Sequence, residues 1–447
     1  MVTLGRPQPS PPRPYHFPAF SETALDTGVR VITCPIPKLP LVTIVVVMDN
    51  GSATEARGKE GIARITAKAL IEGTKKRLGG DLSDTLEKLG TAIHAGADWD
   101  SSMLKVTFLS EHLDLVIALL AEVILEPTFP EREVQRLKDE RIADLVQIES
   151  EPRALADQRF EEFLYSPASR YARPAEGSRE SVSALTRADI EGFHRARYQP
   201  AATTVVVAGD VARDDVNKKL AAQFAGWKPA TRTAPETGPN TRARETRTVR
   251  IVEKADAPQS EVRVGHVGVP RRHPDYFSLV VMNAVLGGLF GSRINLNLRE
   301  AHGYTYGASS YFDWRRDAGP FVISTAVQSE VTAAALKEVF LEVERMRVDE
   351  VSQSELSLAK DYLDGVFPIR YETTSAIASA LANMAIHNLP RDYYDTYRQN
   401  IQSVSATDAL HAAHNHLRSA EIQTLIVGHP AMVRDAIADL GIGPVEA

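Results

Sequence analysis

The sequence predicts an α+β protein of two similar lobes, each a mixed β-sheet flanked by helices, joined by a central linker. Strand-like apolar runs alternate with helix-like amphipathic runs along the chain. An aperiodic segment rich in Pro, Thr and Arg, residues 226–247, lies near the middle of the chain. Two stretches that resemble each other, one before this segment and one near the C-terminal end, indicate an internal repeat. The predicted parts are a proline-rich N-terminal arm (1–20), a first lobe (21–228), a linker (229–247) and a second lobe (248–447).

The composition of the 447-residue chain excludes some classes of function. Its formal net charge is −7, so no global excess of cations seeks the phosphates of nucleic acid. Cys34 is the only cysteine, which rules out a disulfide within the chain and fits a reducing compartment. Apolar runs are shorter than the roughly 20 residues of a membrane span, and the N-terminus lacks a signal-peptide core. We expect a cytoplasmic protein, or an exported one if a leader was removed, that binds neither nucleic acid nor membranes.

The first half begins with two strand-like runs, "GVRVITCPI" (28–36) and "LVTIVVVMDNG" (41–51), which we expect to pair with each other. The charged run 129–165 has helical periodicity, and Pro152 is expected to break it. The other elements predicted here are two helices within 61–90, a strand over 103–110 and a helix over 111–125.

A repeat links the ends of the two halves. Residues 181–210 and 403–430 both contain S-V-S-A, then a helical stretch, a polar break and an apolar strand that ends in glycine. Because the central linker lies between the two copies, duplication explains the match better than chance. The sequence therefore predicts that each lobe ends in a helix-then-strand unit.

The segment "LREAHGYTYGASSYF" (298–312) holds the clearest candidate binding residues. Gly303 is placed to end a helix with a left-handed cap, so Arg299 would lie on the last helical turns and Tyr306 at the start of the next strand. Both side chains can donate hydrogen bonds to a peptide carbonyl or its oxyanion. The alternative is a solvated helix-end arginine and a half-buried strand tyrosine.

Two other groups carry a weaker signal. His411 and His414 share a helix face in "HAAHNH", which also includes His416, but no carboxylate lies at ligand spacing on that face. We therefore expect solvated or capping histidines, with an independent metal site as the alternative. Cys34 follows the pattern of a small buried strand residue. The sequence has no P-loop, no G-x-G-x-x-G after a strand and no G-x-S-x-G.

With these segments in view, the chain resembles the pitrilysin/insulinase family of zinc metallopeptidases, the inverzincins, whose metal helix carries H-x-x-E-H. The resemblance covers nearly the whole chain. The segments that carry it are the opening strands with the approach to the metal helix (27–63), the helix of the third metal ligand (127–152), the end of the first lobe (181–211) and the Arg/Tyr segment of the second lobe (287–312).

The metal motif itself is missing. Set on the family pattern, "GIARITAKALIEGT" (61–74) places Arg64 at the first histidine, Ala67 at the general-base glutamate and Lys68 at the second histidine. The distal glutamate falls near Asp144. Two cations repel a divalent ion, and an alanine cannot take a proton from water. We expect Arg64 or Lys68 to pair with Asp144 in place of metal coordination.

The resemblance implies a role in trans. Some family members divide the work between a subunit with the metal motif and a subunit with the Arg/Tyr pair, and this chain resembles the second kind. It implies a non-catalytic subunit of a heterodimeric peptidase, with no metal in this chain, zinc in an H-x-x-E-H partner, and Arg299 and Tyr306 on the peptide substrate. The segment 90–111 resembles the substrate-pairing edge strand, or is simply a sheet edge. The alternative function is a peptide-binding or scaffold subunit, with a homodimer as the other assembly.

Overall fold

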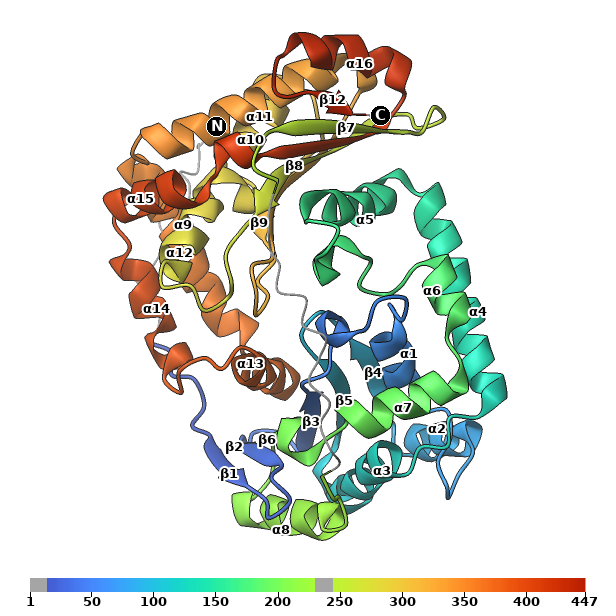
Figure 1. The fold of residues 1–447 in the computed structure, drawn as a ribbon. Coiled ribbons are helices and arrows are strands. Elements are labelled where there is room, and N and C mark those ends of the chain that lie inside the picture. Colours follow the sequence, from blue (N-terminus) through green and yellow to red (C-terminus); the bar gives the residue numbers. More distant parts are fainter. Residues whose placement is uncertain (1–13, 230–243, 447) are drawn as a thin grey trace, which may run out of the picture.

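Two six-stranded mixed β-sheets, one from each half of the chain, form the framework of the protein (Figure 1). The structure is a computed structural model that describes residues 14–229 and 244–446. The first sheet has the order β1-β2-β6-β3-β5-β4, and the second has the order β12-β7-β11-β8-β10-β9. The strands are β1 (Ser21–Ala24), β2 (Arg30–Pro35), β3 (Leu41–Met48), β4 (His94–Ala97), β5 (Ser102–Leu109), β6 (Thr203–Gly209), β7 (Thr248–Glu253), β8 (Ser260–Val267), β9 (Ala308–Phe312), β10 (Pro320–Val327), β11 (Gln423–Gly428) and β12 (Val445–Glu446).

Helices cover both sheets, so the predicted α+β fold of two similar lobes is confirmed. The predicted break at Pro152 is also confirmed, because one helix ends at Ser150 and the next begins at Pro152. The helices are α1 (Ile62–Ala69), α2 (Gly79–Lys88), α3 (Leu113–Leu125), α4 (Glu131–Ser150), α5 (Pro152–Leu164), α6 (Arg179–Ala184), α7 (Arg187–Arg197), α8 (Arg213–Phe224), α9 (Tyr276–Asn283), α10 (Arg293–Asn295), α11 (Thr332–Val348), α12 (Gln353–Arg370), α13 (Thr374–Ile386), α14 (Tyr393–Ser403), α15 (Ala406–His416) and α16 (Pro430–Asp439), with π-helical turns η5 (Ala284–Gly288) and η6 (Leu296–Ala301).

The repeat has a direct structural counterpart. The strand that closes each repeat lies inside its sheet: β6 is parallel to β2 and antiparallel to β3, and β11 is parallel to β7 and antiparallel to β8. The preceding helices α7 and α15 both begin with a capping box, at Thr186 and Ser405. An alignment of the two repeats that equates Thr186 with Ser405 differs by three positions from the alignment that overlays the two S-V-S-A strings.

The expected pairing of the first two apolar runs is wrong. The sequential strands β2 and β3 do not touch as neighbours, because β6 inserts between them. Most of β6 is fully buried, so its backbone needs a partner on each side. Pro35 at the end of β2, and Pro37 and Pro40 between the two runs, also lack the N–H groups that a tight hairpin ladder would use.

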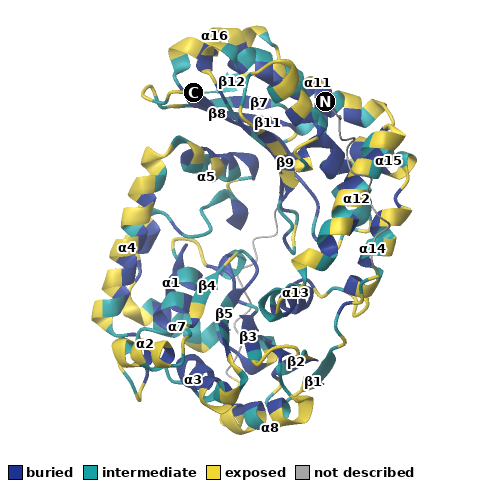
Figure 2. Cartoon of the chain, turned by 180° about the vertical axis from the view of Figure 1, so that it is seen from behind, coloured by how far each residue is buried: buried dark blue, intermediate teal, exposed yellow. Residues whose placement is uncertain are grey.

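The two halves exchange a helix. Helix α5 from the first half packs on β8 and β11 of the second sheet, while α13 from the second half packs on β3 and β6 of the first sheet. Phe160 and Phe163 of α5 share a buried cluster with Leu425 of β11, and Ile377 of α13 shares one with Val206 of β6. Figure 2 shows α13 in the buried and intermediate colours. Each sheet is therefore completed by the other half of the chain.

Charged side chains cross between the lobes beside these helices. The backbone N–H of Arg316 donates to Asp100 at 3.0 Å, and its guanidinium binds Asp49 and donates to the carbonyl of Ile386 at 2.7 Å. Burial raises the pKa of Asp100 to about 6, although Arg316 acts in the opposite direction. This junction fixes one end of α13 to the first lobe.

One helical stretch, Tyr276–Ala301, has the length and apolar composition that a membrane crossing requires. It is interrupted between α9 and α10, and it forms part of the helical layer of the second lobe. Its apolar side chains enter the core, which accounts for its composition without a membrane. These side chains are Leu279, Val281, Met282, Val285, Leu286 and Leu298. The predicted arm and linker fall partly at 1–13 and 230–243, outside the described residues.

Candidate functional site

Helix α1, which the resemblance aligns with a metal helix, is an intact core helix. Ile62, Ile65 and Ala69 are buried, as the helical spacing predicts, and α1 packs against β4, β5, α4 and α7. Its N-terminus is held by Glu55, whose carboxylate accepts hydrogen bonds from the backbone N–H groups of Gly61 at 3.1 Å and Ala63 at 2.9 Å. The loss of metal-binding residues has therefore left the packing of this helix undisturbed.

Glu55 itself is fully buried and paired with the guanidinium of Arg170. Burial raises the pKa of Glu55 to about 7, against the opposing effects of Arg170 and the two backbone donors. Arg170 also donates to the carbonyl of Arg173 at 2.7 Å. The helix start is thus tied to the loop that follows α5.

An ion-pair cluster includes Arg64 of α1, but its carboxylate is not the expected one. Arg64 binds Glu176, and Arg141 on α4 lies 3.0 Å from the other oxygen of the same carboxylate. Asp144 is 3.9 Å from Arg141 and 52% exposed, and Lys68 has no ion pair within the described residues. The predicted pairing with Asp144 is therefore wrong.

The geometry of α4 explains the difference. Arg141 lies one helical turn before Asp144, and its side chain, 8% exposed, reaches inward, where Nε donates to the backbone carbonyl of Glu176 at 3.1 Å. Burial lowers the pKa of Arg141, although Glu176 opposes that effect. Arg141 was not singled out from the sequence, and neither was Glu176, which comes from an irregular loop whose position no periodic pattern predicts.

Arg299 lies on η6 as expected. Its guanidinium carbon is 4.4 Å from the ring centroid of Phe290, an aromatic side chain that is itself 73% exposed, and Nη1 is 3.4 Å from Glu300. The turn ends at Gly303, with a φ of 66° and a hydrogen bond from its N–H to the carbonyl of Arg299 at 3.2 Å. The predicted left-handed helix end at Gly303 is confirmed.

Tyr306 lies in the loop before β9, two positions ahead of the strand, and is 92% exposed. The loop around it is held in place: Thr305 exchanges hydrogen bonds with Gly307, and the N–H of Ala308 donates to Asn295 at 2.9 Å. The backbone at Tyr306 is therefore held by hydrogen bonds, while its phenol ring is almost fully exposed to solvent. Among the described residues no contact joins Tyr306 to Arg299; both side chains project from one short segment.

Each sheet has an edge strand beside one of these candidate sites. Among the strands of residues 14–229 and 244–446, β4 pairs only with β5, and β9 pairs only with β10, so each leaves one row of backbone groups without a strand partner there. β4 packs near α1, and β9 follows the loop of Tyr306. The predicted segment 90–111 thus includes a true sheet edge.

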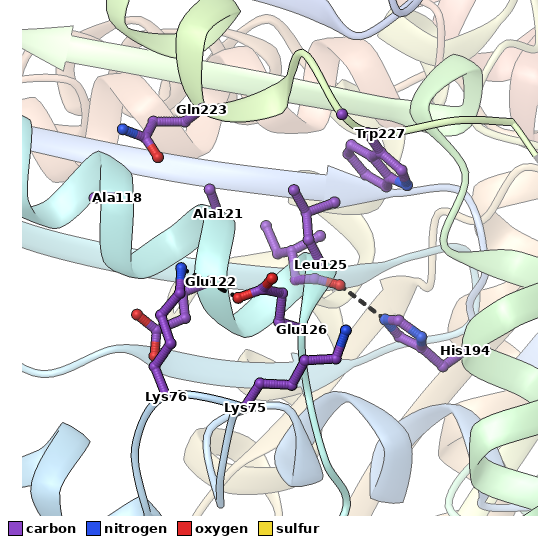
Figure 3. Close-up of a pocket in the computed structure, with 12 residues that line it drawn as sticks. Lys75, Lys76, Ala118, Ala121, Glu122, Leu125, Glu126, His194, Gln223 and Trp227 are labelled. Carbon is purple, nitrogen blue, oxygen red and sulfur yellow. Dashed lines mark hydrogen bonds and ion pairs between the residues drawn. The ribbon is translucent and has the colours of Figure 1, made fainter.

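Two hollows flank the first lobe. One, of about 340 Å³, opens beside the Arg64 cluster and is bordered by Arg141, Glu176 and three further carboxylates, those of Asp157, Glu161 and Glu162. The other, of about 380 Å³, is shown in Figure 3.

Several polar side chains at the hollow of Figure 3 are engaged with each other or with the backbone. Lys76 is paired with Glu126 at 3.1 Å. Nε2 of His194 donates to the carbonyl of Ile124 at 2.9 Å, and burial lowers the pKa of His194 to about 4, so that its ring is neutral near pH 7.

The remaining candidates from the sequence, three histidines of α15 and Cys34, differ in how far they are buried. His411 and His414 are exposed on α15, whereas His416 is half-buried and bonded to another segment. Cys34 is buried in β2, as expected, and burial raises the pKa of its thiol to about 12.

Comparison with known proteins gives consistent matches over both halves. Residues 30–177 match the model described as insulinase (peptidase family M16), and residues 184–363 match the one described as peptidase M16 inactive domain. An uncharacterized zinc protease of Mycobacterium tuberculosis is 27% identical over 430 residues, covering 94% of this chain and 96% of the relative. A non-peptidase homologue of Helicobacter pylori is 25% identical over 377 residues, covering 82% and 84%.

Solved structures agree on the fold. A peptidase M16 inactive domain from Pseudomonas fluorescens superimposes with a TM-score of 0.85 at 25% identity, covering 92% of this chain and 98% of that one. A protease from Helicobacter pylori superimposes with a TM-score of 0.86 at 21% identity, covering 92% and 100%. The relatives thus include proteins named as zinc proteases and one named as a non-peptidase.

Proposed function

The chain belongs to the insulinase (M16) peptidase family, and from this premise we propose that it is the non-catalytic subunit of a heterodimeric zinc peptidase. Its partner would be a homologous subunit that carries the H-x-x-E-H helix. Arg299 and Tyr306 of this chain would bind the substrate carbonyl and the developing oxyanion at the partner's zinc. Peptides are the substrate class.

The observation that carries the proposal is the chemistry of α1. Zinc requires neutral imidazoles, thiolates or carboxylates at about 2 Å. The corresponding positions here offer the guanidinium of Arg64, the methyl group of Ala67 and the ammonium of Lys68. The carboxylate that Arg64 binds, Glu176, is already shared by two arginines. The residues present do not fit a metal ion, and Ala67 supplies no base for a water nucleophile.

The second lobe supports the same proposal from the other side. Arg299 and Tyr306 are presented outward on a segment whose backbone is held by local hydrogen bonds. At 92% exposure, the ring of Tyr306 is accessible to a ligand or to another chain. Charge-assisted donation from Arg299 is the type of interaction that stabilises an oxyanion.

The test is reconstitution with an H-x-x-E-H homologue from the same source. The chain alone should cleave no peptide, and the mixture should cleave. In the mixture, Arg299→Ala should lower kcat/KM by roughly 10²–10³, the scale of one lost oxyanion donor. Arg434→Ala, at an exposed position on α16, is the matched control and should change nothing. An unaltered rate with Arg299→Ala would remove the assigned role.

A second function, peptide binding without cleavage, is favoured by the sheet edge at β4, which can pair with an extended main chain. The hollow near Arg141 is lined by four carboxylates, but each is already paired with an arginine: Asp157 with Arg263, Glu161 with Arg315, Glu162 with Arg159, and Glu176 with Arg64 and Arg141. The main chain, rather than charge, would therefore be what such a site recognises. Affinity purification from the source cell separates the two functions, since co-purification of an H-x-x-E-H protein supports the first and its absence supports the second.

A further inference from the structure

Two histidines and an aspartate meet on the second lobe, far along the chain from α1. His273 and Asp275 lie just before α9, and His416 is the last residue of α15. The packing of α9 on α15 brings them together, so that one ligand atom from each side chain lies within 4.8 Å of the other two. Within residues 14–229 and 244–446 this is the one group of three such side chains at that spacing.

The contacts within the group define its protonation. Nε2 of His416 donates to Oδ2 of Asp275 at 2.7 Å. Nδ1 of His273 accepts the backbone N–H of Asp275 at 3.2 Å, so this nitrogen carries a lone pair, and it lies 3.9 Å from Oδ2 of Asp275. The two imidazole rings meet edge to face with their centroids 4.7 Å apart.

We propose that His273, Asp275 and His416 form a binding site for a divalent ion of the zinc type. Two imidazoles and one carboxylate are an established donor set for zinc, and three protein ligands leave the fourth tetrahedral position to water. Bonds of about 2.1 Å in a tetrahedron place donor atoms roughly 3.4 Å apart. The aspartate and His416 must therefore separate slightly and His273 must approach. Nε2 of His416, which donates to Asp275, must also lose its proton, either to its own Nδ1 or to solvent, before it can bind the ion.

The surrounding charges permit this. Arg418 is the cation that opposes metal binding, and its Nη1 lies 3.4 Å from Glu421, which offsets part of its charge. The neighbouring His266 is fully buried and uses both ring nitrogens in backbone hydrogen bonds, so it does not compete.

This site is independent of the proposed peptidase role and revises one expectation. Helix α1 still lacks metal ligands, but the chain on its own would carry one ion on its second lobe. The histidines of "HAAHNH" are candidate ligands in the sequence, but no carboxylate lies at helical spacing from them on the same face. The structure supplies the carboxylate from Asp275, 141 positions before His416.

The experiment uses the full chain after treatment with a chelator. Isothermal titration with Zn²⁺ and the visible absorption of bound Co²⁺ should both show one ion per chain with tetrahedral character. His273→Ala and His416→Gln should each weaken Zn²⁺ binding by at least roughly 10- to 100-fold, the loss known even for outer partners of metal ligands. The His411→Ala/His414→Ala double variant, on the same helix, should bind as the parent does.

His416→Gln keeps an N–H donor for Asp275, so the link between α9 and α15 is preserved while the ligand is removed. Circular dichroism and the melting temperature without metal verify that each variant is folded. Binding of less than one equivalent by the parent would overturn the proposal, as would binding that survives both single substitutions. Either result would leave His416 and Asp275 as a hydrogen-bonded helix link. Reconstituted peptidase activity has no bearing on this outcome.

Discussion

Arg64 of α1 and Glu176 of the loop after α5 form an ion pair at the position where the family keeps its metal helix. Arg141 shares the carboxylate, so one negative group compensates two positive ones. Where the resemblance places neutral and anionic ligands around a metal cation, this chain has an anion held by two cations.

Glu176→Gln tests the cluster. It leaves the buried Arg141 with no full counter-charge, and breaking a buried pair from one side is costly, up to about 3–5 kcal/mol. Since Arg64 is partly solvated, we expect about 1–3 kcal/mol of destabilisation, measured by urea unfolding. Asp144→Asn is the control and should stay within about 0.5 kcal/mol. Equal effects of the two substitutions would contradict the assignment of Glu176.

Asp100→Asn should change the pH dependence of stability. The pKa of Asp100 is raised to about 6 in the folded protein, so the wild type loses stability as pH rises from about 4 to 6 while this carboxyl ionises. Asparagine does not ionise and still accepts the N–H of Arg316. Relative to wild type, the variant should gain up to about 3 kcal/mol between pH 4 and pH 7. Denaturant midpoints across this range measure the stability difference between the variant and the wild type. A difference that does not change with pH would contradict the raised pKa of Asp100.

Phe290→Ala should weaken the placement of Arg299 without affecting folding. The ring contributes about 0.5–1 kcal/mol of cation–π interaction at an exposed site. In the reconstituted peptidase this corresponds to roughly a 2- to 5-fold loss of kcat/KM, and Phe290→Trp should restore it. The melting temperature should not move, because the side chain is largely exposed. A loss that tryptophan fails to rescue would argue for a different role of the ring.

Gly303→Ala should destabilise the protein by about 1 kcal/mol, because φ at this position is 66° and a β-carbon is strained there even though space is open around it. Gly365→Ala is the matched control, since it is exposed within α12 and also has open space. Replacing a helical glycine should stabilise by about 0.5–1 kcal/mol. Thermal melts of the two variants should therefore move in opposite directions.

Local features of the sequence predicted local structure well. The break at Pro152, the cap at Gly303 and the buried stripe of Ile62 and Ile65 all depend on a few neighbouring residues. Long-range pairing was beyond such patterns. The insertion of β6 between β2 and β3 joins segments more than 150 positions apart, and periodicity contains no information about which strands meet.

The same limit applies to the sites. The duplication was visible in the sequence, but the chance agreement of S-V-S-A set its register three positions away from the structural one. Arg299 and Tyr306 were recognisable because they share one short segment. Glu176 and Asp275 each come from an irregular loop and act on a side chain of a distant helix, so no spacing rule could have paired them with Arg64 or His416.

The exchange of α5 and α13 makes the duplicated protein a single cooperative unit. A sheet deprived of the other half's helix would expose an apolar face, so neither half is expected to be soluble on its own. Cutting the chain within the central linker should nevertheless preserve the whole, because the two pieces interlock. The two similar halves of the chain therefore depend on each other for a complete core.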